Sequence, residues 1–501
     1  MRAQRLVLRN SAWLEAVGPV RAAFFGSLIL SWLALLRGDL VNRDGVIYLD
    51  AARTILEQGL AAVGQLNPVW MAFSTLVAGI AALTGLKPEA AAHLLNALFL
   101  AGACGLLVAV TRRRMPEAAW AACLVALAMP AYNGYRDMVL REFGFWFFCL
   151  LALWLAMRWE DAPRWREAIA CQAVLALAAF FRLEAIAFYP ALMLWQLFAA
   201  PSGQRLRRAF MIGGIPFTLS LLGAVLIAGG QIPLPGRLAY YLEAVSQAHK
   251  LQAIHDAAQR MSEAVLKHKY SREEAGYILV FGLLSVIPVK FVKMAGVFVV
   301  PLAYPLLAQP LRAFLARWRP LGWLFLAHAV VLAFFVTHEF FLVGRYVALL
   351  HLLAVPIAAV GVALLWQRFP RWRAAIAALA LLTMAANVVS LSPPKTHIVE
   401  AGRWLAEHAS DPRRVGTDNV RIVYYAGWKS GDAQVLDRAG LCKALAEHGL
   451  DLVAIEATRK DADAEDWLRQ NGLVSLQRFT NKEGGSVIVA APQSTADPNV
   501  R

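Results

Sequence analysis

The sequence predicts a mainly α fold: a polytopic bundle of transmembrane helices followed by a small C-terminal α/β domain outside the membrane. Of the 501 residues, 59% are hydrophobic and 17% are charged, with a mean hydropathy of +0.52, whereas soluble domains carry about 25% charged residues. Apolar runs that can cross a ~30 Å hydrocarbon core, each of ~20 residues, recur through residues 1–392. Because these runs do not alternate with a period of two, they predict helices rather than barrel strands.

Clusters of basic residues indicate which ends of the predicted helices face the cytoplasm. The net charge is +15, but Lys and Arg fall in short clusters between apolar runs, which is typical of topology signals rather than of a nucleic-acid surface. Arg2, Arg5 and Arg9 precede the first apolar run, and no small-residue cleavage site follows it, which favours a retained span over a signal peptide. The five cysteines form no CxxC pair or disulfide framework.

With every basic cluster on the cytoplasmic side, the sequence predicts about eleven spans. They lie near residues 20–36, 89–110, 117–133, 143–159, 167–181, 184–200, 209–229, 294–310, 321–337, 345–366 and 374–391. The N-terminus is then cytoplasmic and the C-terminal domain extracytoplasmic, as expected for a multi-pass membrane protein. Residues 67–85 must form an interfacial or re-entrant helix, and residues 277–309 a surface helix, broken near Pro288 and Lys290, that leads into one span.

Pro393-Pro394 marks the end of the bundle, because proline cannot continue a helix. We therefore predict a transmembrane domain over 1–392, an extracytoplasmic domain over 395–492 and a disordered tail over 493–501. Within the second domain the pattern predicts helices over 398–408, 441–448 and 464–471, and strands over 414–417, 452–455 and 486–490.

The segment after the first span contains a candidate catalytic carboxylate. Asp44 lies between Arg43 and Gly45, at the predicted junction of bilayer and water, where its surroundings can tune its pKa. A structural role is also open, since Asp is a favoured N-cap residue and Gly59 would end a helix that begins at Val46. The two roles are compatible.

A second exterior loop carries Asp137 and Glu142. On a helix these two positions diverge by about 140°, so we expect only one of them to face the pocket of Asp44. Farther along, Arg182 and Glu184 interrupt a long apolar stretch. They are either an ion pair at the tip of a hairpin or functional groups at membrane depth.

Cations recur on the same predicted side. Thr337-His338-Glu339 and Gly344-Arg345-Tyr346 flank one loop, and the Arg345 guanidinium could bind a phosphate or anchor a helix at the interface. Lys290 and Lys293, three residues apart, share a helical face and could meet a lipid phosphate or extend to water.

Taken in order, these motifs resemble the polyprenyl-phosphate-dependent membrane glycosyltransferases of the C-type superfamily, which include the protein O-mannosyltransferases of family 39 and the lipid A aminoarabinose transferases. The matching residues are Arg43-Asp44-Gly45 through Tyr48 and Ala52, Asn67-Pro68, Arg141-Glu142, Arg182-Leu183-Glu184-Ala185, Gly344-Arg345-Tyr346, Ala401-Gly402-Arg403-Trp404-Leu405 and Tyr424-Tyr425-Ala426-Gly427. The resemblance covers nearly the whole chain.

The resemblance implies transfer of a sugar from a polyprenyl-phosphate donor to an acceptor hydroxyl of a membrane lipid, glycan or protein. Asp44 would be the general base, with Glu142 or Asp137 beside it, and these carboxylates could hold a divalent cation, Mg²⁺ or Mn²⁺, with Asp44 and Glu142 as ligands. Arg345, Lys290, Lys293 and Arg182 would neutralise the donor phosphate. The implied substrate-binding residues are Tyr48, Glu184, Tyr346, His338 and Glu339.

Two positions depart from the family pattern. Members with protein acceptors usually carry an Asp-Glu pair in the first loop and a His-Pro-Pro-Leu run later, whereas this chain has Asp44-Gly45 and Asn67-Pro68-Val69-Trp70. We therefore favour a bacterial enzyme that acts on an envelope glycan or lipid. The alternatives are a flippase for lipid-linked sugars, which internal repeats and charges at the membrane midplane would favour, and an inactive envelope scaffold.

Overall fold

The computed structural model describes residues 2–36, 40–62, 71–233, 247–389, 395–447, 449–457 and 464–493. The chain forms two compact units, which are described one at a time. The bundle unit contains residues 1–32, 96–136 and 141–388, and the second unit contains residues 33–95, 137–140 and 389–501. Asn67-Pro68, Pro393-Pro394 and the tail from 494 lie outside the described residues.

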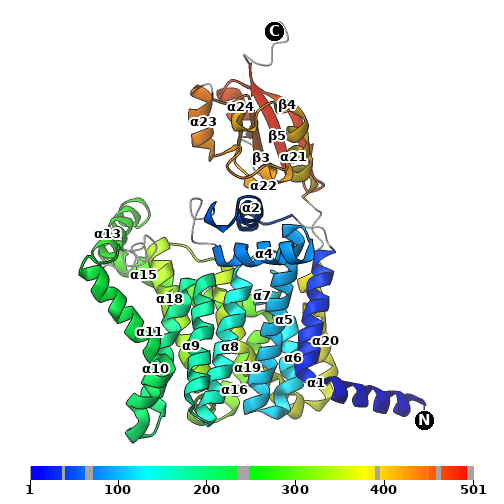
Figure 1. Cartoon of the computed structure of the whole chain (residues 1–501), viewed down its shortest axis with the longest axis vertical. Helices are drawn as coiled ribbons and strands as arrows, with labels where there is room; N and C mark the ends of the chain where they lie inside the picture. Colours follow the sequence, from blue (N-terminus) through cyan, green and yellow to red (C-terminus); the bar gives the residue numbers. More distant parts are fainter. Residues whose placement is uncertain are drawn as a thin grey trace. The chain divides into compact units, whose positions relative to one another are not determined.

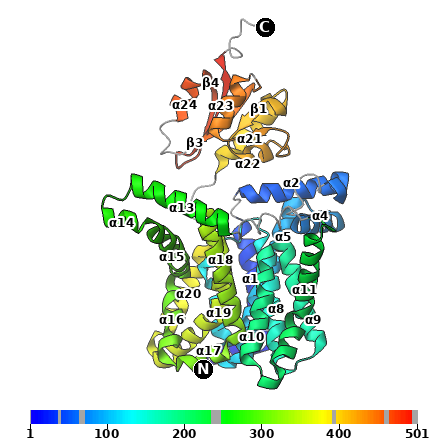
Figure 2. The same ribbon diagram turned by 90° about the vertical axis from the view of Figure 1, so that its left-hand side faces the viewer.

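The bundle unit is built from helices that run side by side (Figures 1 and 2). Its α-helices are α1 (Arg2–Leu35), α5 (Pro88–Arg114), α6 (Ala119–Ala128), α7 (Pro130–Asn133), α8 (Glu142–Asp161), α9 (Trp165–Phe181), α10 (Phe188–Ala199), α11 (Arg205–Ala228), α13 (Gln247–Ala264), α14 (Lys269–Glu273), α15 (Ala275–Ala295), α16 (Val299–Ala308), α17 (Leu311–Arg317), α18 (Arg319–Glu339), α19 (Gly344–Arg368) and α20 (Arg373–Val388). The most buried of the long apolar helices is α19, in which 89% of an apolar stretch of 18 residues is buried. It forms the centre of the bundle.

Seven helices in the described part of the chain are long and apolar enough to cross a membrane. They are Val17–Leu35, Pro88–Arg114, Glu142–Asp161, Ser202–Ala228, Ala275–Ala308, Arg319–Glu339 and Gly344–Arg368. The other predicted spans coincide with shorter helices, namely α6 with α7, α9, α10 and α20. The chain is therefore a multi-pass membrane protein, and the predicted helical bundle is confirmed.

The predicted helix break near Pro288 and Lys290 is wrong. Helix α15 continues through both residues to Ala295, and the chain then turns at Gly296, whose φ of 55° lies in the left-handed region that glycine adopts readily. A proline inside a membrane helix is tolerated where neighbouring helices compensate for the lost hydrogen bond. The break therefore falls at the glycine, before the 3₁₀ turn Gly296–Phe298 and α16.

A buried arginine joins α1 to the segment after α7. Arg136 is 4% exposed. Its guanidinium donates to the Ser27 carbonyl at 2.8 Å, to Ser31 Oγ at 2.8 Å and to Asn133 Oδ1 at 2.6 Å. The two terminal nitrogens of this buried guanidinium thus donate to neutral acceptors, whereas its Nε is buried without a partner among the described residues.

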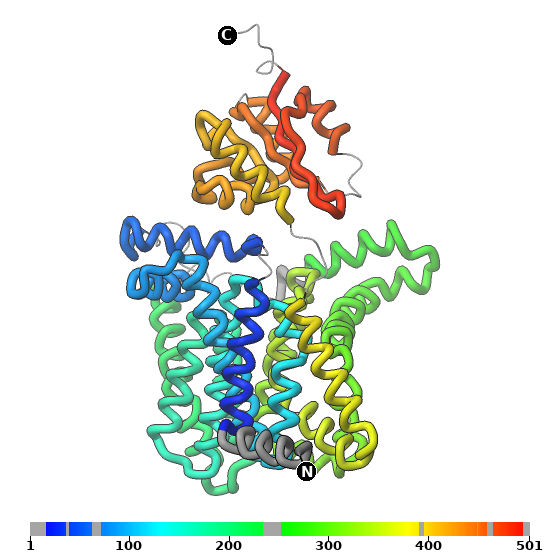
Figure 3. Tube along the Cα trace, turned by 90° about the vertical axis from the view of Figure 1, so that its right-hand side faces the viewer, coloured from blue at the N-terminus to red at the C-terminus, as the bar shows by residue number. Residues whose placement is uncertain are grey.

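The second unit contains α2 (Arg43–Gln58), α4 (Met71–Thr84), the start of α5 and the predicted α/β domain (Figure 3). That domain has helices α21 (Thr396–His408), α22 (Val420–Tyr425), α23 (Arg438–Ala446) and α24 (Ala464–Gln470), and strands β1 (Val415–Thr417), β2 (Gln434–Val435), β3 (Leu452–Ala457), β4 (Leu473–Thr480) and β5 (Ser486–Pro492). The strand order is β2-β1-β3-β5-β4; β1 pairs parallel with β2 and β3, whereas β5 is antiparallel to β3 and β4.

Alternation along the two central strands builds a core on each face of the sheet. Ala454 of β3 and Val487 of β5 face α21 and α22, while Val453 and Ile488 face α23 and α24. The predicted helices and strands of this domain are confirmed. Strand β2, helix α22 and strand β4 were not predicted, and β4 exposes most of its residues at the edge of the sheet.

Candidate functional site

Three charged side chains meet inside the bundle unit. Arg182 Nη1 donates to Glu142 Oε1 at 2.9 Å, and Arg182 Nη2 donates to Glu184 Oε1 at 2.5 Å. The side chains of Arg182, Glu142 and Glu184 are 9%, 3% and 14% exposed, respectively. The ion pair predicted between Arg182 and Glu184 is therefore present, and Glu142 joins it from 40 residues away in the sequence.

A second arginine completes this charge cluster. Arg345 Nε lies 3.4 Å from Glu142 Oε1, and its side chain is 21% exposed, the most accessible of the four. The guanidinium carbons of Arg182 and Arg345 lie 4.3 and 5.5 Å from the centroid of the Tyr346 ring, within cation–π range. Two cations thus balance two carboxylates.

Helix ends position these groups. Glu142 is the first residue of α8, where the helix dipole favours a negative charge, and Arg182 follows the last residue of α9, where it favours a positive one. Arg345 is in the first turn of α19, after Gly344. A Cβ on Gly344 would lie 2.8 Å from the Tyr135 hydroxyl oxygen and 3.1 Å from Met294 Sδ, so glycine allows the three segments to meet.

Of the two predicted lysines, Lys290 is tied to the same loop. Its Nζ donates to the carbonyl of Leu342, three residues before Arg345. Lys293 is exposed on the last turns of α15. The structure therefore brings Lys290 to the segment that carries Arg345.

The predicted base, Asp44, belongs to the second unit. The Asn42 side chain accepts from Val139 N at 2.8 Å and donates to Val139 O at 3.2 Å, so the start of α2 is bound to the segment that contains Asp137. A Cβ on Gly45 would lie 2.9 Å from Val139 Cβ. Two of the predicted carboxylates, Asp44 and Asp137, thus lie on segments that hydrogen bonds join.

The predicted N-cap role of Asp44 is wrong. Helix α2 begins at Arg43, so its N-cap is Asn42 and Asp44 lies in the first turn. A carboxylate in the first turn still interacts favourably with the helix dipole. Asn42 makes no capping bond because its side chain is used by Val139. The predicted C-cap is confirmed, since Gly59 has a φ of 82°.

The other predicted substrate-binding residues are spread more widely. Tyr48 is 4% exposed and packs edge-on against Phe73, with ring centroids 5.3 Å apart, in the interface of α2 and α4. At the end of α18, His338 Nε2 lies 3.7 Å from Glu339 Oε1. A role of these three residues in substrate binding stays a prediction.

Helix α2 also carries a buried carboxylate that the sequence analysis missed. Asp50 is 8% exposed and accepts hydrogen bonds from the backbone N–H of Ser430, at 2.8 Å, and from its hydroxyl. Burial raises the pKa of Asp50 above its usual value, although the Ser430 bonds and nearby Arg53 oppose the shift. The contact joins α2 to the terminal domain.

Tyrosines of the motif Tyr424-Tyr425 strengthen this contact. The Tyr424 hydroxyl donates to Glu89 Oε2 at 2.8 Å, its ring lies 4.5 Å beneath the Arg53 guanidinium, and the Tyr425 hydroxyl accepts from Val41 N at 3.0 Å. Burial raises the pKa of Tyr424 well above its usual value. The Tyr424-Tyr425 motif, one of those that resemble the family, therefore binds the terminal domain to the segment that follows the first span and to the start of α5.

Glu142 does not fit the predicted role of metal ligand. Its Oε1 already faces two guanidiniums, which repel a divalent cation. Within the described ranges, no group of three or more His, Cys, Asp or Glu side chains comes together as a potential cation site. Metal use by Asp44 stays a prediction, and no step below depends on it.

Comparisons with known proteins identify the fold. No protein-family model matches the chain, and no curated protein matches it in sequence. The crystal structure of the Archaeoglobus fulgidus oligosaccharyltransferase, tethered by a disulfide bond to an acceptor peptide with an NVT sequon, matches with a TM-score of 0.58 at 12% identity, covering 97% of this chain and 76% of that chain. The chain has the fold of that oligosaccharyltransferase.

Two structures of ArnT from Cupriavidus metallidurans match less well. The apo structure and the complex with undecaprenyl phosphate both have TM-scores of 0.44, at 14% and 15% identity; they cover 98% and 95% of this chain and 100% and 98% of theirs. The resemblance to membrane glycosyltransferases that the motifs predicted is thus confirmed for the fold, by the oligosaccharyltransferase.

Proposed function

We propose that this chain is a glycosyltransferase that moves a sugar from a polyprenyl-phosphate donor to an acceptor hydroxyl at the outer face of a bacterial plasma membrane. The carrying observation is the buried charge cluster of Glu142, Arg182, Glu184 and Arg345, in a multi-pass bundle with an oligosaccharyltransferase fold. Buried ionisable groups in a membrane protein are costly and point to a functional site.

The cluster offers groups suited to both substrates. Arg345 is its most exposed cation and can bind the donor phosphate through paired N–H donors. Glu142 Oε2 is buried and has no hydrogen-bond partner among the described residues, so it can accept a hydrogen bond from a sugar or acceptor hydroxyl. Arg182 holds Glu142 and Glu184 in place.

In the proposed reaction, Asp44 takes the proton of the acceptor hydroxyl while its oxygen attacks the anomeric carbon. The bond from that carbon to the phosphate oxygen breaks, and the lipid phosphate leaves with its electron pair. Arg345 and Lys290 neutralise the charge that develops on the phosphate. Glu142 and Asp137 support the acceptor side, and Lys293, Tyr48, His338 and Glu339 are further candidates for substrate contacts.

The test is sugar transfer by purified protein from polyprenyl-phospho-sugars to candidate lipid, glycan and protein acceptors. Asp44→Asn should lower transfer by about 10²–10⁴-fold, the usual contribution of a positioned base. The control is Asp256→Asn, which removes a carboxylate from α13 that bonds only to Gln252 among the described hydrogen bonds. Equal transfer by wild type and Asp44→Asn would refute the base assignment.

The same preparation separates the enzyme from the alternatives. Movement of intact donor across a vesicle bilayer, with no transfer to any acceptor, would establish a flippase instead. Absence of both transfer and movement with every donor would favour an envelope scaffold.

A further inference from the structure

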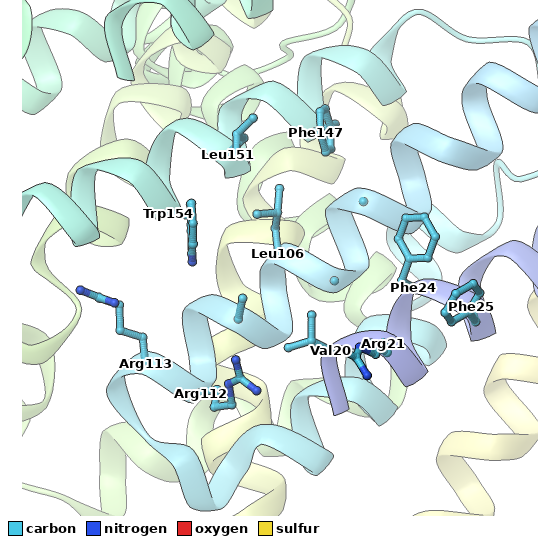
Figure 4. Close-up of a pocket in the computed structure, with 13 residues that line it drawn as sticks. Val20, Arg21, Phe24, Phe25, Leu106, Arg112, Arg113, Phe147, Leu151 and Trp154 are labelled. Atoms are coloured by element: carbon cyan, nitrogen blue, oxygen red, sulfur yellow. The ribbon is translucent and has the colours of Figure 1, made fainter. Parts of the chain in front are cut away.

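The bundle unit has a large groove on the surfaces of α1, α5 and α8, with a volume of about 820 Å³ (Figure 4). Its walls are mostly apolar; they include Phe24 and Phe25 of α1, Leu106 of α5, and Phe147, Leu151 and Trp154 of α8. No residue of the charge cluster lines it. This α1–α5–α8 groove is therefore separate from the candidate active site.

Small residues on one face of α5 create the space. Gly102, Gly105 and Ala109 line the groove. A Cβ on Gly102 would lie 2.5 Å from Phe147 Cε2, so glycine is needed there for α5 to approach α8. A Cβ on Gly105 would make ordinary contacts, 3.7 Å from the Val20 carbonyl oxygen and 3.8 Å from Phe24 Cβ. Gly105 therefore leaves room that a larger side chain would fill.

Arginines gather where α5 ends and the apolar part of α1 begins. Arg21, Arg112 and Arg113 line the groove, and no Asp or Glu lines it. Arg113 pairs with Asp161, and the next residue, Arg114, pairs with Glu160. The side chains of Arg21 and Arg112 make no ion pair or hydrogen bond with any residue that the structure describes. Two guanidiniums at one end of an apolar groove thus lack a counter-charge among the described residues.

We propose that the α1–α5–α8 groove binds an anionic phospholipid, with an acyl chain along the apolar walls and the phosphate at Arg21 and Arg112. The groove volume lies within the usual range for ligand sites, and guanidinium pairs match phosphate geometry. The basic end of α5 is predicted to be cytoplasmic, and anionic lipids concentrate in that leaflet. Since the proposed transfer occurs at the outer face, this lipid is a resident ligand and not the sugar donor.

The experiment measures lipid retention by the purified full-length chain with native mass spectrometry. Phosphatidylglycerol and phosphatidylcholine with identical acyl chains are added separately. Wild type should retain phosphatidylglycerol preferentially, and Arg21→Gln/Arg112→Gln should weaken that retention by roughly tenfold or more, since each basic residue contributes to the attraction of an anionic headgroup. The matched control, Arg207→Gln/Arg371→Gln, removes two exposed arginines outside the groove.

The apolar part of the groove is tested at Gly105. Gly105→Phe should lower retention of phosphatidylglycerol, whereas Gly105→Ala should retain it, because a Cβ alone fits. Thermal unfolding checks that each variant is folded. If Gly105→Phe does not fold, lipid retention by Arg21→Gln/Arg112→Gln tests the proposal instead. Equal retention of the two lipids by wild type, or unchanged retention after loss of Arg21 and Arg112, would overturn the proposal. Displacement of phosphatidylglycerol by an equimolar polyprenyl phosphate would overturn its phospholipid specificity.

Discussion

The two units both bury carboxylates but stabilise them by different means. In the bundle unit, Glu142 and Glu184 face Arg182, and Arg345 adds a second guanidinium. In the second unit, Asp50 relies mainly on the hydroxyl and N–H of Ser430, with Arg53 at 3.6 Å. Because arginine stays protonated in proteins, the first arrangement keeps fixed charges in place. Burial raises the pKa of Asp50 in the second arrangement, so we expect the contact between α2 and the terminal domain to depend on pH.

The largest expected effect comes from removing the cation that the bundle carboxylates share. Arg182→Met leaves Glu142 and Glu184 without their main partner, and breaking a buried ion pair costs about 3–5 kcal/mol. The free energy of unfolding should therefore fall by that amount, measured by denaturation of the detergent-purified chain. Arg368→Met, at the exposed end of α19, is the control.

A second variant sharpens the cause. Glu142 still faces Arg345 in Arg182→Met, so Arg182→Met/Glu184→Gln removes the carboxylate that has lost its arginine and should be more stable than Arg182→Met alone. If the double variant is less stable than the single one, packing of the arginine stem and not charge balance holds the cluster.

The next effect tests the contact between the start of α2, which carries Asp44, and Val139. Gly45→Ala places a Cβ 2.8 Å from Asn42 Oδ1 and 2.9 Å from Val139 Cβ, and overpacking typically costs about 1–3 kcal/mol. We expect a loss of stability of that size and a lower rate of sugar transfer, because the first turn of α2 must shift. Gly79→Ala, in helix α4 of the same unit, is a mild comparison, since nothing lies within 4 Å of a Cβ there and its φ is not positive. Normal transfer by Gly45→Ala would show that the function of Asp44 does not depend on the contact with Val139.

Measuring the free energy of unfolding against pH tests whether Asp50, unlike the carboxylates of the bundle unit, titrates in the folded chain. Burial raises the pKa of Asp50 above 3.8 in the folded chain, so the folded state binds this proton more readily than the unfolded state. The contribution of Asp50 to stability should therefore grow as the pH falls from neutrality toward 3.8 and be lost as the pH rises through the folded-state pKa. Unfolding of wild type and Asp50→Asn across this range measures the difference between them. A difference that is constant with pH would show that Asp50 does not titrate in the contact.

The smallest effect concerns one hydrogen bond of the terminal domain. Tyr424→Phe removes the 2.8 Å bond to Glu89 but keeps the ring beneath Arg53, so it should cost about 1 kcal/mol. Thermal unfolding measures this loss, and Tyr270→Phe, at a residue that is 72% exposed, is the matched control. Equal unfolding temperatures for both variants would mean that the Glu89 bond adds nothing to the contact.

Much of the fold could be predicted, because bilayer-length apolar runs and short apolar strands between turns are local signals. The central strands β3 and β5 are short, mostly buried apolar runs, whereas β4 exposes most of its residues and gives no such pattern. The break assigned to Pro288 illustrates a limit of local rules, since the tertiary surroundings tolerate the proline and the turn occurs at Gly296.

The candidate site was predictable in its residue types but not in its pairings. Arg182 and Glu184 are two residues apart and could be paired from the sequence, whereas Glu142 and Arg345 reach them only through helix packing. Asp50 was missed because one acidic residue in an amphipathic helix gives no sign of its partner, Ser430, 380 residues later. Its spacing of four residues from Val46 on the buried face of α2 was the available clue.

The buried guanidinium of Arg136 bears on how the chain is made. A charged side chain that is taken out of water without hydrogen-bond partners is costly. Its acceptors on α1, Ser27 and Ser31, precede it by 109 and 105 residues, so ribosomal synthesis delivers them first. Ser27 and Ser31 are therefore already part of the chain when Arg136 is added, and loss of the first helix would leave the Arg136 guanidinium without these two acceptors.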